Sequence, residues 1–212
     1  MRTLENALRR IGFVNVGGVD EVGRGCLAGP VVAAAVVLDP ARHIPGVCDS
    51  KLVPPPERAR LSERIKRHAV AWAVAEADPA EIDRVNIHQA SLRAMQRAIL
   101  ALAPLPDIVL VDAFRVPDLP MAQRPVVHGD RRCAAIAAAS IVAKVARDRL
   151  MHELHARDPR YGFDRHKGYA TAEHLDAVAR FGYSDAHRRS FRRPTLFAAG
   201  AEPPDHFDTM DQ

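Results

Sequence analysis

The chain has 212 residues, of which 48% are hydrophobic but only 5% aromatic, and its formal net charge is +4. This length favours one domain with a sizeable core built largely from small residues, and no apolar run is long enough to span a bilayer. Three cysteines without metal-ligand spacing argue against a disulfide framework or a zinc ribbon. We therefore expect a cytoplasmic protein that has no membrane partner.

Hydrophobic patterning predicts strands and helices that alternate along the chain. The expected strands are two within 13–39, joined at a glycine-rich turn, followed by 70–75, 108–111 and 125–128. The expected helices cover about 57–68, 86–103, 133–157 and 171–180. This order predicts one α/β domain over residues 1–196. Residues 197–212 contain two prolines and scattered acids, and we expect them to form a disordered acidic tail.

Two adjacent acids, Asp20 and Glu21, end the first apolar strand, and the turn Gly23-Arg24-Gly25 follows at once. Carboxylates side by side repel each other unless a hard cation lies between them. Glycines that flank an arginine allow a phosphate to approach both the backbone and the guanidinium. This run therefore indicates a metal-dependent nuclease or phosphoryl-transfer site.

Two further acids complete a candidate metal-binding set. Asp112 ends the strand at 108–111, and Asp130 follows the strand at 125–128. A two-metal nuclease needs about four carboxylates around ions roughly 3.5–4 Å apart. A lone acid after a strand is more often a turn residue, so the hypothesis depends on all four together. Neighbouring strand residues point to opposite faces, so Asp20 and Glu21 share a site only if the strand distorts or the glutamate reaches around.

These acids belong to a series of motifs in a fixed order along the chain. The series is DEVGRG at 20–25, DSK at 49–51, VD at 111–112, GD at 129–130, AASIVAKV at 138–145, YGF at 161–163, HKGY at 166–169 and HRRSF at 187–191. In these motifs the chain resembles the bacterial ribonuclease HII (type 2 ribonuclease H) family over about residues 13–192. The resemblance implies a ribonuclease H-like fold, with a central mixed sheet flanked by helices and a helical C-terminal portion.

The resemblance also implies a function. It predicts an endonuclease that cuts the RNA strand of RNA–DNA hybrids and cuts 5′ of single ribonucleotides embedded in duplex DNA. The products would carry 5′-phosphate and 3′-hydroxyl ends, and the cellular task would be ribonucleotide removal in replication and repair. Asp20 and Asp112 would share two Mn²⁺ or Mg²⁺ ions, and Glu21 and Asp130 would each complete the shell of one ion. Nothing in the sequence demands more than a monomer.

Candidate contacts to nucleic acid follow from the same motifs. Gly23, Arg24, Gly25 and Tyr169 match the family's residues that sense the RNA–DNA junction, where the 2′-hydroxyl distinguishes RNA. Lys51 is a candidate phosphate contact. Ser140, Lys144 and Arg147 share one helix face and are expected to grip successive phosphates, with a solvated Lys144–Asp148 pair as the alternative. The basic run 188–193 either binds nucleic acid or pairs with the acidic tail.

Several positions depart from the usual family sequence, and two other functions stay open. Ala113 replaces a glycine, His128 a lysine, Ala146 a threonine and Ala170 a proline. None of these changes removes a proposed metal ligand. The first alternative function is a catalytically silent nucleic-acid-binding protein. The second is a related nuclease that acts on DNA junctions, or only on hybrids with several consecutive ribonucleotides.

Overall fold

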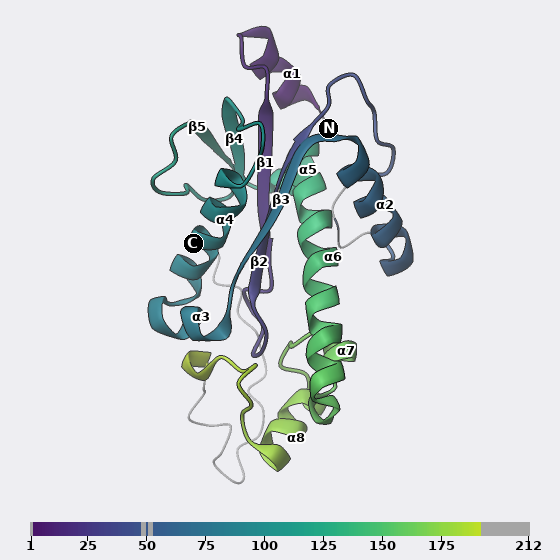
Figure 1. The fold of residues 1–212 in the computed structure, drawn as a ribbon, viewed down its shortest axis with the longest axis vertical. Coiled ribbons are helices and arrows are strands. Elements are labelled where there is room, and N and C mark those ends of the chain that lie inside the picture. The colour runs from purple at the N-terminus through teal and green to yellow at the C-terminus, as the bar shows by residue number, and fades with distance from the viewer. Residues whose placement is uncertain (1, 48–49, 51–52, 192–212) are drawn as a thin grey trace.

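The computed structural model describes residues 2–47, 50 and 53–191, and these residues form a five-stranded mixed sheet in the order β3-β2-β1-β4-β5. The strands are β1 Val16–Val22, β2 Val31–Leu38, β3 Ala69–Ala77, β4 Ile108–Asp112 and β5 Ala122–Val126. The ribonuclease H-like α/β fold expected from the sequence is thus confirmed (Figure 1). Lys51 and the tail 197–212 lie outside the described residues, so the statements made about them stay predictions.

The helices expected from the sequence are present, and short ones lie between them. The helices are α1 Thr3–Arg10, α2 Pro55–His68, α3 Pro79–Val85, α4 Ile87–Leu100, α5 Gly129–Arg132, α6 Ala134–Arg157, α7 Phe163–His166 and α8 Ala172–Phe181, with 3₁₀ turns η2 Pro159–Tyr161 and η3 Arg189–Phe191. The strand predicted at 125–128 was wrong, because β5 ends at Val126. His128 has a φ of 53°, a left-handed conformation that cannot continue a strand.

The sheet is covered on both faces, and β2 shows why. Every residue of β2 is buried, and alternate side chains point to opposite faces. Ala33 and Ala35 pack with α4, whereas Ala34 and Val36 pack with α2 and α6 on the other face. Such continuous burial explains the unbroken apolar run of this strand. The long helix α6 lies along the sheet and continues beyond it (Figure 1).

The approach of α6 to the sheet depends on a glycine in the central strand. A Cβ atom on Gly18 would lie 2.3 Å from the carbonyl carbon of Ala135 and 2.4 Å from the nitrogen of Ile136. No side chain fits into this space, so the helix backbone lies directly against β1. This close packing brings the middle of α6 within reach of the acidic end of β1.

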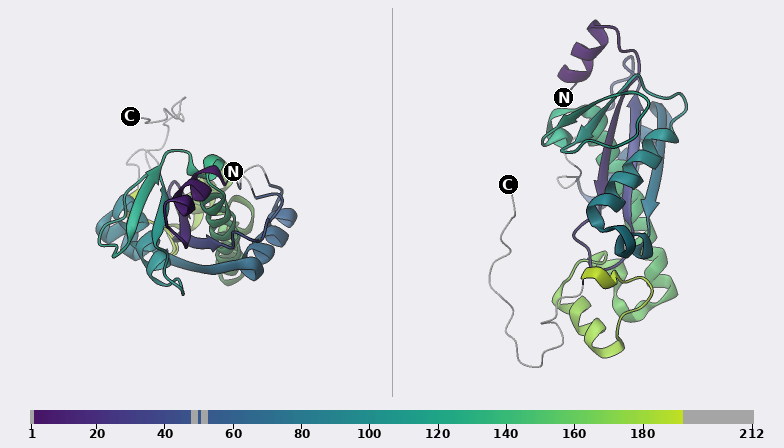
Figure 2. Two further views of the ribbon diagram at one scale, coloured as in Figure 1. Left: turned by 90° about the horizontal axis from the view of Figure 1, so that it is seen from above. Right: turned by 90° about the vertical axis from the view of Figure 1, so that its left-hand side faces the viewer.

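Residues 159–191, which we call the C-terminal module, pack at the far end of α6 (Figure 2). Tyr161 and Phe163 are buried there with Met151 of α6 and with Leu27 and Ala28 of the β1–β2 connection. The module is therefore joined to the turn that follows the acidic pair. Among the described residues, every helix is too short or too polar to cross a membrane.

Candidate active site

Asp20 and Asp112 meet because two parallel strands are in register. β1 pairs with β4 from Val16 opposite Ile108 to Val19 opposite Val111, and the pairing ends there. Asp20 and Asp112 are the next residues on each strand, so their side chains leave the sheet on the same face. The geometry brings together two carboxylates that are 92 positions apart in the sequence.

The Asp20 carboxylate is buried, with only 7% of the residue exposed. Its Oδ1 accepts a hydrogen bond of 2.8 Å from the backbone N–H of Glu21, and the nearby Ser140 hydroxyl acts to lower the pKa of the same carboxylate. Burial raises the pKa of Asp20 well above its usual value, and the charges of Glu21 and Asp112 raise it further. A cation at this position would stabilise the ionised carboxylate and so lower its pKa again.

Glu21 points to the opposite face of β1, as the alternation of a strand requires. Its register partner Ala33 packs on the α4 face, whereas the partner of Asp20, Ala34, packs on the α6 face. Glu21 Oε1 accepts from Arg24 Nη1 at 3.2 Å, while Oε2 is buried and has no hydrogen-bond partner. Burial raises the pKa of Glu21, and Arg24 opposes this shift. The unpartnered oxygen fits a metal ligand.

Asp112, at the end of β4, lies close to the segment that carries Asp130, the last candidate acid. Its Oδ1 accepts from the backbone N–H of Gly129 at 2.7 Å, and Asp130 is the next residue, half-buried in the short helix α5. Within the described ranges, no three His, Cys, Asp or Glu side chains are close enough together to form a ready-made metal site. Asp20, Glu21 and Asp112 interact electrostatically, and the assignment of Asp130 to the same site stays a prediction.

The departure at Ala113 has a structural cost. Ala113 has a φ of 58°, a conformation that glycine adopts without strain and that costs an alanine roughly 1–2 kcal/mol. The flanking hydrogen bonds hold the residue there: its N–H donates to the Val126 carbonyl at 3.1 Å, and Phe114 N–H donates to the Asp112 carbonyl at 2.7 Å. The Phe114 ring then lies 4.8 Å from the Arg24 guanidinium carbon. The strained Ala113 thus precedes Phe114, whose ring supports Arg24 of the glycine-rich turn.

The predicted row of phosphate-binding side chains on α6 is only partly present. Arg147 is fully buried, and it donates to the carbonyls of Pro30 at 3.0 Å, Ala28 at 3.2 Å and Lys167 at 2.9 Å. The prediction that Arg147 grips a phosphate was therefore wrong. The sequence could not show that the helix face turns inward where the β1–β2 connection crosses it.

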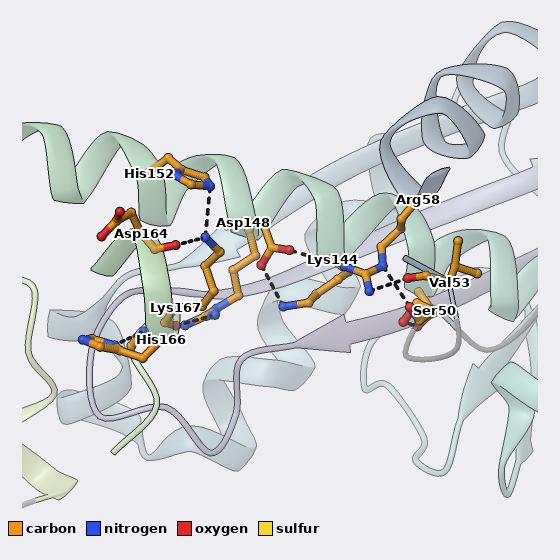
Figure 3. Close-up of polar contacts among 12 residues, drawn as sticks. Ser50, Val53, Arg58, Lys144, Asp148, His152, Asp164, His166 and Lys167 are labelled. Carbon is orange, nitrogen blue, oxygen red and sulfur yellow. Dashed lines mark hydrogen bonds and ion pairs between the residues drawn. The ribbon is translucent and has the colours of Figure 1, made fainter. Parts of the chain in front are cut away.

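Lys144 lies in a polar network that links α6 to α2 through Asp148 and Arg58 (Figure 3). The Ser140 hydroxyl lies 2.9 Å from that of Ser50. Lys144 binds Asp148 at 2.7 Å, which is the pair that the sequence offered as an alternative, and Asp148 also lies 3.6 Å from Arg58. Lys144 nevertheless keeps 21% of its side chain exposed. Ser50 was not predicted to take part, although it lies inside the DSK motif.

Tyr169 lies at the junction of the C-terminal module and the glycine-rich turn. The carbonyl of Gly168 accepts from the backbone N–H groups of Leu27 at 2.8 Å and Ala28 at 3.3 Å. The Tyr169 side chain is 45% exposed. Partial burial raises its pKa, with a further contribution from the neighbouring Cys26. An exposed ring beside the turn is available to a sugar.

Three buried histidines support the backbone on which Tyr169 sits. His174 Nδ1 lies 2.8 Å from the Tyr169 carbonyl, which can only accept, so this nitrogen carries the proton. His187 Nδ1 accepts from the N–H of Ser184 at 3.0 Å, so its Nε2 donates to His174 Nε2 at 3.1 Å. His166 Nδ1 likewise accepts from Gly168 N–H at 3.1 Å. In the described structure these histidines hold the backbone around Tyr169.

This network predicts acid sensitivity. Burial lowers the pKa of His174 and His187 from 6.5 to about 4. The unfolded chain therefore binds more protons than the folded one between these values, and stability falls as the pH drops from 6.5 to 4. The loss from His187 is at most about 3 kcal/mol. Thermal unfolding from pH 7 to 4.5 should show a flatter decline in His187→Gln, while the exposed His43→Asn should follow the wild type.

The fold and the acids together define a class. Parallel strands that present buried carboxylates at the end of a central antiparallel hairpin, with a glycine-rich turn alongside, are the features of a ribonuclease H-like nuclease. The comparisons with known proteins narrow this class to one family.

A model of the ribonuclease HII family matches residues 17–194. The chain is 55% identical to ribonuclease HII of Thiobacillus denitrificans over 85% of this chain and 89% of that protein. Among solved structures, ribonuclease H2 of Pyrococcus horikoshii OT3 superposes with a TM-score of 0.71 at 24% identity, covering 84% of this chain and 94% of that one. Bst-RNase HIII in complex with Mn²⁺ gives 0.68 at 23% identity, covering 87% and 69%.

The chain belongs to the ribonuclease HII family. It is an endoribonuclease, a divalent-metal-dependent hydrolase that acts on RNA in RNA–DNA hybrids. The resemblance drawn from the sequence motifs is thus confirmed.

Proposed function

We propose that this protein, besides cutting RNA–DNA hybrids, cuts on the 5′ side of single ribonucleotides embedded in duplex DNA. The products carry 5′-phosphate and 3′-hydroxyl ends, and the reaction serves ribonucleotide removal during DNA replication and repair. The protein acts in the cytoplasm as a monomer. The observation that carries the proposal is the mutually repelling set of the buried Asp20 with the half-buried Glu21 and Asp112, beside the Gly23-Arg24-Gly25 turn.

Carboxylate oxygens are the donors that Mn²⁺ and Mg²⁺ prefer, and we propose that two such ions draw these acids together when they bind. We assign Asp20 and Asp112 as ligands shared by both ions, with Glu21 and Asp130 each completing one shell. When bound, such ions activate a water for attack on phosphorus and stabilise the departing 3′-oxygen. Ser140 stabilises the ionised form of the Asp20 carboxylate. Arg24 forms an ion pair with Glu21, and a bound cation would replace Arg24 as the partner of this carboxylate. The free Oε2 of Glu21 supports this assignment.

The turn and Tyr169 are the proposed reading elements for the ribonucleotide. Gly25 is exposed, and none of the described residues lies within 4 Å of the position that a Cβ would take, so a sugar can approach its backbone. The Tyr169 ring offers a surface against that sugar, and its hydroxyl can bond to the 2′-OH. Lys144, partly exposed in its pair with Asp148, is the proposed phosphate contact, together with Lys51.

A single assay tests this function. Duplex DNA with one ribonucleotide is incubated with the protein in Mg²⁺ or Mn²⁺, and parallel samples contain chelator. We expect one cut on the 5′ side of the ribonucleotide and none with chelator, because the buried acids alone cannot stabilise the charge on phosphorus.

The other outcomes separate the alternatives. Cleavage of a hybrid with several consecutive ribonucleotides, but not of the single-ribonucleotide duplex, would contradict embedded-ribonucleotide incision and favour the narrower nuclease. Binding of both substrates without cleavage of either would support the silent binding protein. Analysis of the ends of the product strands distinguishes 3′-hydroxyl from 3′-phosphate products.

A further inference from the structure

The β1–β2 connection, residues 23–30, has an irregular backbone whose polar groups are bonded by other parts of the chain. The N–H groups of Leu27 and Ala28 donate to Gly168, and that of Gly29 donates to the Ala186 carbonyl at 2.8 Å. Two buried arginines serve the carbonyls. Arg147 binds those of Ala28 and Pro30, so it holds the second half of the connection.

Arg188 holds the first half, which contains the turn. Its Nη2 donates to the Gly23 carbonyl at 2.6 Å, its Nη1 to the Arg24 carbonyl at 2.7 Å and its Nε to the Gly29 carbonyl at 2.9 Å. The residue is fully buried, and burial lowers its pKa to about 10. The sequence analysis expected this arginine to bind nucleic acid or pair with the tail, whereas within the described residues its guanidinium binds carbonyls of the turn.

The segment that carries Arg188 is itself fastened on both sides. The Arg188 N–H donates to the Leu27 carbonyl at 2.9 Å. One residue further on, the carboxylate of Asp83 on α3 accepts from the N–H groups of Arg189 and Ser190, both at 2.8 Å. The Phe191 ring lies 5.2 Å from the Arg188 guanidinium carbon. The planar guanidinium is thereby fixed in the one orientation that reaches three carbonyls.

We propose that Arg188 is a positioning residue that fixes the Gly23-Arg24-Gly25 turn and so sets the preference of the enzyme for a lone ribonucleotide. The inference rests on the proposed function. A lone ribonucleotide offers a single 2′-hydroxyl, so recognition depends on a turn backbone that is already in place. A hybrid with consecutive ribonucleotides has further 2′-hydroxyls and depends on the turn less. All three side-chain hydrogen bonds of Arg188 go to backbone carbonyls of the connection and none goes to the proposed metal-binding acids.

The test compares two substrates in Arg188→Lys. Lysine keeps the charge but cannot reach three carbonyls with a planar fork. We expect kcat/KM for the single-ribonucleotide duplex to fall at least about tenfold, mainly through KM, and that for a consecutive-ribonucleotide hybrid to fall less than about threefold. The matched control is Arg180→Lys, because Arg180 is an exposed arginine of the same C-terminal module that lies outside the basic run. This control should leave both substrates unchanged.

Equal losses on both substrates, or no loss on either, would overturn the proposal. If Arg188→Lys shows no cooperative unfolding transition, Asp83→Ala replaces it, since that change loosens the same segment from outside; an unchanged substrate ratio there overturns the proposal as well. Amide hydrogen exchange gives a second measurement. Residues 23–29 should exchange at least about tenfold faster in the variant, with 16–19 unchanged.

This exchange measurement separates the two proposals. If the wild-type protein cuts the hybrid but not the single-ribonucleotide duplex, the proposed function is wrong, and so is the preference assigned to Arg188. Unchanged exchange at 23–29, in an enzyme that does cut the single-ribonucleotide duplex, removes the role of Arg188 alone.

Discussion

Replacing Asp20 by Asn is expected to lower the rate of cleavage at least about a thousandfold, which corresponds to about 4 kcal/mol of transition-state stabilisation. Asp20 is the acid that interacts with both Glu21 and Asp112, so its loss removes the proposed shared ligand of both ions. Affinity for the nucleic acid should change little, because the turn and Tyr169 are retained. Single-turnover cleavage and a binding titration measure the two quantities separately.

The same substitution should make the metal-free protein more stable. The folded-state pKa of Asp20 lies above the unfolded value of about 3.8, so the folded protein binds more protons, and stability falls as the pH rises from 3.8 through the raised pKa. Removing the carboxylate removes this penalty. At pH 7 in chelator, Asp20→Asn should therefore melt above the wild type, and Mg²⁺ should stabilise only the wild type.

The control for this prediction is Asp185→Asn, which removes an acid from an exposed position. It should leave both cleavage and melting unchanged. Cleavage by Asp20→Asn at the wild-type rate would contradict the metal assignment.

Gly18→Ala is expected to lower the free energy of unfolding by about 3 kcal/mol or more, since overpacking against a backbone cannot be relieved by a side-chain rotation. The added Cβ would lie 2.3 Å from the backbone of α6, so the helix has to move away from β1. For a chain of this size the melting temperature should fall by roughly 6–12 °C. Denaturant unfolding followed by circular dichroism measures the change.

Gly17→Ala is the matched control on the neighbouring residue. Its Cβ would lie 3.3 Å from the Cβ of Pro106 and 3.5 Å from a methyl group of Val109, on the other face of the strand. These side-chain contacts can adjust, so the cost should stay within about 1 kcal/mol. Equal effects of the two changes would show that glycine flexibility, and not the approach of α6, limits stability at this strand.

Much of the architecture was predictable because apolar residues recur along the sequence with the spacing of a strand or a helix. The apolar run of β2, the Asn86 cap that accepts from Gln89 N–H at 3.0 Å, and the helix from Ala134 to Arg157 follow from local pattern. The meeting of Asp20 with Asp112 did not follow from pattern, because it depends on strand register. Only the motif order of the family brought these acids into one hypothesis before the fold was known.

The two arginines were misplaced for one reason, which is that the sequence does not show where a charged side chain points. Arg147 and Arg188 look like surface cations in the sequence, yet both are buried against carbonyls of the β1–β2 connection. A guanidinium has five donors, so it can satisfy an irregular backbone that has no strand partner. The need for such donors becomes visible only once the path of residues 23–30 is known.

The hydrogen bonds around this connection also order the events of synthesis. The acids of β1 leave the ribosome early, whereas the groups that bind residues 23–30 are supplied by positions 147, 168, 186 and 188. Translation proceeds from the N-terminus, so a nascent chain carries an unsupported turn until nearly the whole of its described length has been made. The turn that we propose to read the ribonucleotide is thus one of the last parts of the described chain to reach its final conformation.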